Sequence, residues 1–141
     1  MQHDAADIDA HAATAGAHGV WAADAAHLPH IRTVIRGWLA PFALDDDTEQ
    51  DLVLAVNEAV SNAIEHAYDP PGPDDLVEVT FWTDPNHFYV EVADHGHWKE
   101  ATTNGGHRGR GILIMQQMVG SVSIDHDADG TTVLLRHPTR W

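Results

Sequence analysis

The hydrophobic pattern of this chain changes its period at residues 68–75, YDPPGPDD. Before this segment, apolar residues recur at the helical spacing of three and four. After it, LVEVTFW (76–82) and FYVEVAD (88–94) alternate with period two around TDPNH. Proline cannot continue a helix and glycine tolerates turns, so this segment ends a helix and precedes a β-hairpin.

Two helices are predicted before the change of period. Residues 24–42 and 52–68 each carry apolar residues along one side at helical spacing. The polar link between them offers Asp47 or Thr48 as the cap of the second helix. The short segment GVWAA, residues 19–23, is predicted to be an edge strand.

A further helix and hairpin are predicted near the C-terminus. Residues 112–120, ILIMQQMVG, form a short apolar helix, and residues 121–137 form a hairpin that turns at Asp129-Gly130. The whole order predicts an α+β two-layer sandwich, in which helices cover one face of a mixed, mostly antiparallel β-sheet.

The length and composition fit one globular domain. The chain has 141 residues, of which 43% are hydrophobic. Residues 1–18 are rich in Ala, Asp and His without periodicity, so we expect a flexible tail followed by a single domain over residues 19–141. No apolar run approaches the roughly 18 to 20 residues that span a bilayer. The absence of cysteine favours the cytoplasm.

The charge balance argues against nucleic-acid binding. The chain has 7 basic and 22 acidic residues, for a formal charge of -15, and its only lysine is Lys99. A protein that binds a duplex needs a cationic surface to displace phosphate counterions. We therefore expect no direct nucleic-acid partner and no membrane partner.

The second helix carries polar side chains at four-residue steps: Glu58, Asn62 and His66. The helical angles place Ala55 among them, which leaves the polar side uncrowded. A carboxamide oxygen is a hard ligand that Mg²⁺ accepts, and a nearby carboxylate can deprotonate an attacking hydroxyl. On the helix alone, an ordinary solvated face explains the pattern at least as well.

Two later segments add to the pattern. DHG places Asp94 and Gly96 after a strand, where a carboxylate can accept a hydrogen bond from an exocyclic amine. GGHRGRG precedes a helix, where backbone amides bind anions, and its Arg108 and Arg110 supply positive charge. Its glycines are Gly105, Gly106, Gly109 and Gly111.

The last segment, DGTT, puts the hydroxyls of Thr131 and Thr132 at a strand start. Taken in this order, the four segments resemble the ATP-binding elements of the Bergerat-fold (GHKL) superfamily, over about residues 20–137. Within it, LAVNEAVSNAIEHAY is most similar to the RsbW-like anti-sigma-factor serine/threonine kinases. The phosphate-loop motif of other ATPases is absent.

This resemblance implies roles for particular residues. Asn62 would hold Mg²⁺, Glu58 would be the catalytic carboxylate, Asp94 would bind the adenine amine and Gly96 would shape that pocket. His66 matches the family's His-Ala pair and is expected to be structural. The phosphates would be covered by Arg108, Gly109, Arg110 and Gly111, and Thr131 or Thr132 would assist near the base.

The resemblance also implies a function. Such a protein binds ATP and Mg²⁺, phosphorylates a STAS-type anti-anti-sigma partner, sequesters a sigma factor, and acts as a homodimer. The segment that begins with DHG often reads Asp-x-Gly-x-Gly in this family. Here His97 takes the place of the last glycine and is followed by Trp98, which puts nucleotide affinity in question. Two alternatives stay open: a weak or inactive nucleotide-binding module that regulates a partner by binding alone, and a domain cut from a larger regulator.

Overall fold

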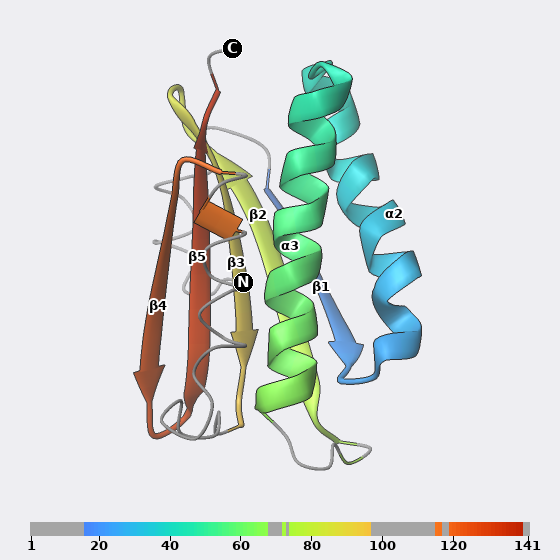
Figure 1. Cartoon of the computed structure of the whole chain (residues 1–141), viewed down its shortest axis with the longest axis vertical. Coiled ribbons are helices and arrows are strands. Elements are labelled where there is room, and N and C mark those ends of the chain that lie inside the picture. Colours follow the sequence, from blue (N-terminus) through green and yellow to red (C-terminus); the bar gives the residue numbers. More distant parts are fainter. Residues whose placement is uncertain (1–15, 68–71, 73, 97–114, 117–118, 140–141) are drawn as a thin grey trace.

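The structure is a computed structural model that describes residues 16–67, 72, 74–96, 115–116 and 119–139. Its elements follow in the order strand, helix, helix, strand, strand, strand, strand (Figure 1). Their bounds are β1 Gly16–Ala22, η1 Ala25–His27, α2 Leu28–Leu39, η2 Ala40–Phe42, α3 Asp46–His66, β2 Leu76–Thr83, β3 His87–Asp94, β4 Ser121–Asp127 and β5 Gly130–Pro138.

The strands form one sheet in the order β1-β2-β3-β5-β4, and each of the described pairings is antiparallel. The two predicted hairpins are confirmed as β2–β3 and β4–β5. The predicted edge strand is confirmed as β1, which begins at Gly16, three residues before the expected domain start.

Helices α2 and α3 lie side by side against one face of the sheet (Figure 1). The buried side chains of β2 and β3 alternate with half-buried ones, which is the period of a strand with one covered face. The predicted α+β two-layer fold is therefore confirmed. None of the described helices is long and apolar enough to cross a membrane.

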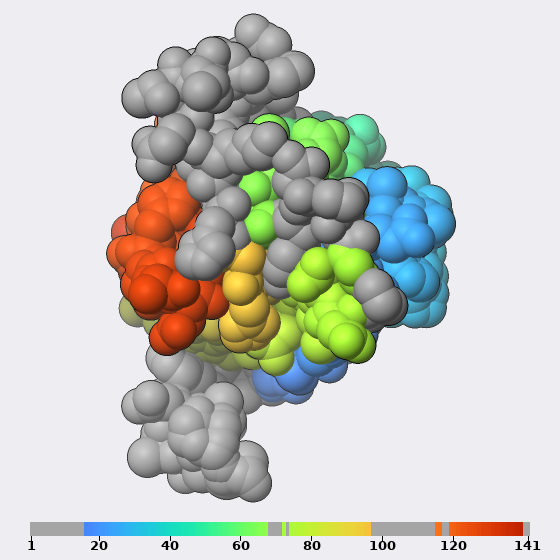
Figure 2. Space-filling model, turned by 90° about the horizontal axis from the view of Figure 1, so that it is seen from below, coloured from blue at the N-terminus to red at the C-terminus, as the bar shows by residue number. Residues whose placement is uncertain are grey.

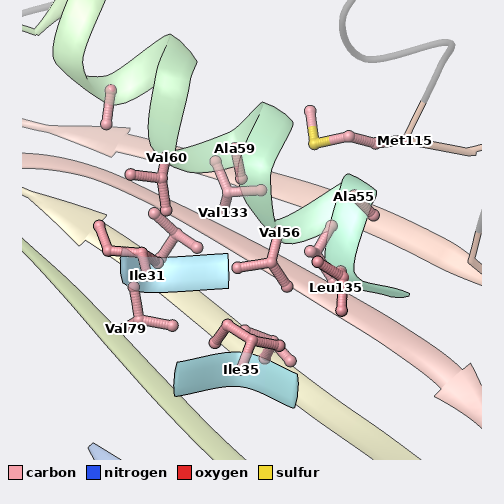
Figure 3. Close-up of a cluster of buried hydrophobic side chains, with 14 of the residues drawn as sticks. Ile31, Ile35, Ala55, Val56, Ala59, Val60, Val79, Met115, Val133 and Leu135 are labelled. Carbon is pink, nitrogen blue, oxygen red and sulfur yellow. The ribbon is translucent and has the colours of Figure 1, made fainter. Parts of the chain in front are cut away.

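The core lies between these two layers. Figure 3 shows side chains of α2 and α3 meeting those of the sheet, with Ile31 near Val79 and Val56 near Leu135. Met115, from the segment before β4, points toward the side of α3 that carries Ala59 (Figure 3). The inner side of α3 is thereby fixed against the sheet, which sets the direction of its remaining side chains.

The predicted cap of the second helix, Asp47 or Thr48, is wrong by two or three residues. The helix begins at Asp46, and the side chain of Asp45 accepts a hydrogen bond of 2.7 Å from the backbone N–H of Thr48. Asp47 lies inside the first turn, where its charge still favours the positive end of the helix dipole. The helix ends at His66, with Ala67 as its C-terminal cap, two residues before the predicted end at residue 68.

The predicted helix over residues 112–120 lies mostly outside the described residues. Met115 and Gln116 are helical, and the N–H of Val119 donates to the carbonyl of Met115 at 3.0 Å.

Candidate functional site

Helix α3 places Glu58 and Asn62 one turn apart. Asn62 is only 5% exposed, and its Nδ2 atom has no hydrogen-bond partner in the described part of the chain. Glu58 is half-buried; burial, and after it the nearby Glu65 carboxylate, raises the pKa of Glu58 above its usual range. A raised pKa makes a carboxylate a stronger proton acceptor.

The polar side of α3 is narrower than its sequence predicts. Ala55, expected among exposed polar groups, is fully buried, and Asn62, two turns further along the helix, is buried as well. Glu65 is exposed, and its Oε1 lies 3.7 Å from Nε2 of His66. The covered side of α3 extends to Ala55 because Ala55 and Ala59 lie in the same buried cluster as Met115 and the sheet residues (Figure 3).

The end of β3 places Asp94 on the covered face of the sheet. Its side chain is 4% exposed, and its Oδ1 accepts hydrogen bonds from the backbone N–H groups of Gly96, at 3.1 Å, and Thr131, at 3.3 Å. Gly96 is buried in the turn that follows. Asp94 and Thr131 are directly opposite each other in the β3–β5 register. The structure therefore brings together DHG and DGTT, which are far apart in sequence.

Figure 2 shows this end of the molecule, where the gold end of β3 lies beside the orange-red turn of β4 and β5. The backbone of Gly130 passes so close to β3 that a Cβ atom there would overlap the carbonyl oxygen of Asp94. Gly130 also has a φ of 145°, which side chains rarely allow. This close approach was not predicted from the sequence, which indicated only a turn.

The two candidate threonines face opposite sides of the sheet. Thr131 is 2% exposed and lies on the covered face with Asp94, whereas Thr132 is half-buried and pairs with Ala93 on the other face. Only Thr131 is therefore brought together with Asp94.

One further residue belongs to this group and was missed. Nδ1 of His126 lies 3.0 Å from Oγ1 of Thr131, its direct partner across the β4–β5 hairpin. The turn at Asp129-Gly130 contained the signal, because counting outward from it pairs His126 with Thr131. The remaining predicted residues, Arg108, Gly109, Arg110 and Gly111, lie outside the described residues, as do His97 and Trp98.

The described side chains fit the groups that a nucleotide and its metal would bring. The unsatisfied atom of Asn62 is the donor Nδ2, and a phosphate oxygen is an acceptor that could pair with it. The oxygen of the same carboxamide is the kind of ligand that Mg²⁺ accepts. Asp94 is held rigidly by two backbone N–H groups, which suits recognition of an amine.

This fold and this arrangement of side chains define an ATP-binding domain of the Bergerat (GHKL) type. Residues 21–137 match the family described as the histidine kinase-like ATPase domain, so the chain belongs to that family. ATP is the nucleotide that an ATPase domain of this family binds.

Solved structures similar to this chain include the following two. One is that of the RsbU and RsbW domains of Rv1364c from Mycobacterium tuberculosis, with 27% identity and a TM-score of 0.66 over 88% of this chain and 32% of that one. The other is the histidine kinase domain of the Erythrobacter litoralis EL346 blue-light activated histidine kinase, with 19% identity and a TM-score of 0.57 over 82% of this chain and 60% of that one. The second likeness shows the fold alone. This chain spans about a third of the first structure's length.

Proposed function

We propose that this protein is an anti-sigma factor with serine/threonine kinase activity, which uses ATP and Mg²⁺ to phosphorylate a STAS-type partner. The observation that carries the proposal is Asn62, buried with an unsatisfied amide, one turn from the raised-pKa carboxylate of Glu58. A module that only binds needs no base beside a metal ligand. The likeness to a structure that contains an RsbW domain supports the same class.

The proposed roles follow from chemistry and position. Asn62 would hold Mg²⁺, which would neutralise charge on the phosphates. Asp94 would accept a hydrogen bond from the adenine amine, with Gly96 shaping the pocket. Glu58 accepts the proton of the attacking serine or threonine hydroxyl as its oxygen bonds to the γ-phosphorus, and ADP departs.

The residues outside the described part have proposed roles as well. Backbone amides at Gly109 and Gly111, with the charges of Arg108 and Arg110, would bind the phosphates. The same proposal includes one kinase domain, which begins with β1 at Gly16 and not at residue 19 as expected. It also includes a flexible tail before that strand, a homodimer, a sequestered sigma factor and a cytoplasmic location.

The test is calorimetric titration with ATP, with and without Mg²⁺, on wild-type protein and on Asn62→Ala. We expect magnesium-dependent binding in the wild type that Asn62→Ala loses. Asn57→Ala is the matched control, because Asn57 lies on the same helix but its Oδ1 accepts a 2.9 Å hydrogen bond from Arg32 on α2.

Either part of the proposal can fail separately. Equal magnesium dependence in wild type and Asn62→Ala would remove Asn62 from the metal site. Mass spectrometry of a STAS-type protein incubated with this protein and ATP tests phosphate transfer. Binding of ATP without any transfer would favour the alternative of a module that regulates by binding alone.

A further inference from the structure

A row of three polar side chains crosses the sheet from its edge strand to the buried carboxylate. His126 on β4 is directly opposite Thr131 on β5, and Thr131 is directly opposite Asp94 on β3. Nδ1 of His126 lies 3.0 Å from Oγ1 of Thr131, and the N–H of Thr131 donates to Oδ1 of Asp94 at 3.3 Å. All three lie on the face of the sheet that carries the proposed nucleotide pocket.

Burial along the row changes sharply. His126 is exposed, whereas Thr131 and Asp94 are almost completely buried. The Thr131 hydroxyl is therefore hydrogen-bonded to a ring that itself contacts solvent, and the tautomer of that ring decides which of the two groups donates. His126 is not part of the resemblance that implied the other site residues.

The direction of the His126–Thr131 hydrogen bond decides whether the Thr131 hydroxyl can donate to a ligand or only accept from it. When Nδ1 of a neutral imidazole accepts the hydroxyl proton, Oγ1 keeps only acceptor capacity for a ligand. When Nδ1 carries a proton, the hydroxyl proton is free for a ligand acceptor. Two acceptor groups, Oγ1 and the Asp94 carboxylate, suit a base edge with an amino group and oppose one with a carbonyl oxygen.

We propose that His126 is a positioning residue that, acting through the Thr131 hydroxyl, makes the pocket discriminate 6-aminopurine from 6-oxopurine nucleotides. This inference rests on the proposed function, in which Asp94 recognises the base. His126 does not contact the base itself; it orients the group that does.

The test compares the affinities of ATP and inosine triphosphate, which differ at position 6 of the purine. We expect His126→Phe, which keeps a ring but removes the nitrogen, to lower the ATP-over-ITP preference about 5- to 10-fold, the usual worth of one hydrogen bond. His126→Asn should restore most of it, since its carboxamide can return an acceptor near Oγ1.

A double-mutant cycle separates positioning from a structural role. In a Thr131→Val background, His126→Phe should change the ATP-over-ITP preference no further, because the hydroxyl through which it acts is gone. His18→Phe is the matched control, since His18 is an exposed histidine on the other edge strand, where it lies 3.5 Å from Glu78; it should leave the preference unchanged.

The outcomes distinguish the two proposals. Wild-type protein that binds neither nucleotide overturns the proposed function, and the inference with it. Wild-type protein that prefers ATP, while His126→Phe keeps the full preference or adds independently to Thr131→Val, overturns the inference alone.

Discussion

Glu58 differs from an ordinary surface carboxylate because the fold removes part of its hydration. Burial raises its pKa, and the Glu65 carboxylate on the same helix raises it further. A general base acts only when deprotonated, so phosphate transfer should fall as the pH drops through this raised pKa. The same shift makes Glu58 a better proton acceptor at neutral pH.

Glu58→Gln is expected to keep ATP binding and to slow phosphate transfer by ~10² to 10⁴, the usual contribution of a positioned base. Glu65→Gln should leave the rate at high pH unchanged and move the acid limb of the pH–rate profile to lower pH, because it removes one cause of the raised pKa. Transfer to a STAS-type protein, followed across pH, checks both. An unaltered rate in Glu58→Gln would exclude Glu58 as the base.

For individual residues, the sequence predicted which side chains belong to the site more reliably than it predicted which residues they contact. Asp94 was predicted from DHG only in combination with the other three segments and the resemblance they carry. The choice between Thr131 and Thr132 needed the strand register, because neighbouring residues face opposite sides. The burial of Asn62 also depended on packing against the sheet, which helical angles alone do not give.

Among the elements, the β4–β5 hairpin joins the fold most directly to the site. Oδ1 of Asp127 accepts hydrogen bonds from the N–H groups of Asp129, at 2.7 Å, and Gly130, at 3.1 Å, which closes the turn. Gly130 then brings β5 against the backbone of Asp94 and His95. The turn itself was predictable from Asp-Gly, whereas this contact with a distant strand was not.

Gly130→Ala should therefore damage both stability and the site. Its positive φ disfavours a side chain by about 1–3 kcal/mol, and the added Cβ overlaps the Asp94 carbonyl. We expect a loss of at least about 2 kcal/mol in urea unfolding, together with weaker ATP binding.

Gly37→Ala is the matched control, since Gly37 lies in α2 with nothing within 4 Å of an added Cβ. It should stabilise the protein by about 0.5–1 kcal/mol. Equal effects of the two substitutions would contradict a special role for Gly130.

The N-terminal cap of α3 could not be predicted from the local sequence pattern alone. LDDDTEQ offers several residues that can cap a helix, and each has the right chemistry. The extended backbone of Asp45, with φ -69° and ψ 163°, selects it over Asp47 and Thr48. Helix existence and the hairpins were predictable from periodicity, but the first residue of α3 was not.

For the molecule as a whole, the two-layer architecture leaves a titratable carboxyl group, that of Glu91, partly buried on the sheet face opposite the helices. Glu91 lies on that face, between Thr80 on β2 and Leu134 on β5 in the register. Burial, and after it the charge of Glu78, raises the pKa of Glu91. A carboxyl group whose pKa is raised in the folded state destabilises that state when ionised, and the penalty is relieved as pH falls through the folded pKa.

The pKa of Asp84, in the β2–β3 turn, is shifted in the opposite direction from that of Glu91. Its Oδ2 accepts a 2.7 Å hydrogen bond from the Tyr89 hydroxyl, and the N–H groups of Asn86 and His87 donate to its Oδ1. These hydrogen bonds, that of Tyr89 first, lower the pKa of Asp84. Its stabilising contribution is present above the unfolded pKa and is lost as pH falls through the folded one.

Glu91→Gln and Asp84→Asn should therefore change stability in opposite directions. At pH 7 we expect Glu91→Gln to stabilise the fold, on the order of 0.5 kcal/mol after allowing for screening, and Asp84→Asn to lower the unfolding temperature. The Glu91→Gln difference from wild type should narrow toward pH 4, as the Glu91 penalty is relieved. The Asp84→Asn difference should persist to pH 4 and narrow only below it, because the pKa of Asp84 is lowered from 3.8. Thermal unfolding between about pH 2 and 8 measures both. A Glu91→Gln advantage that grows on acidification would show that the ionised Glu91 is stabilised in the fold, which would contradict its raised pKa.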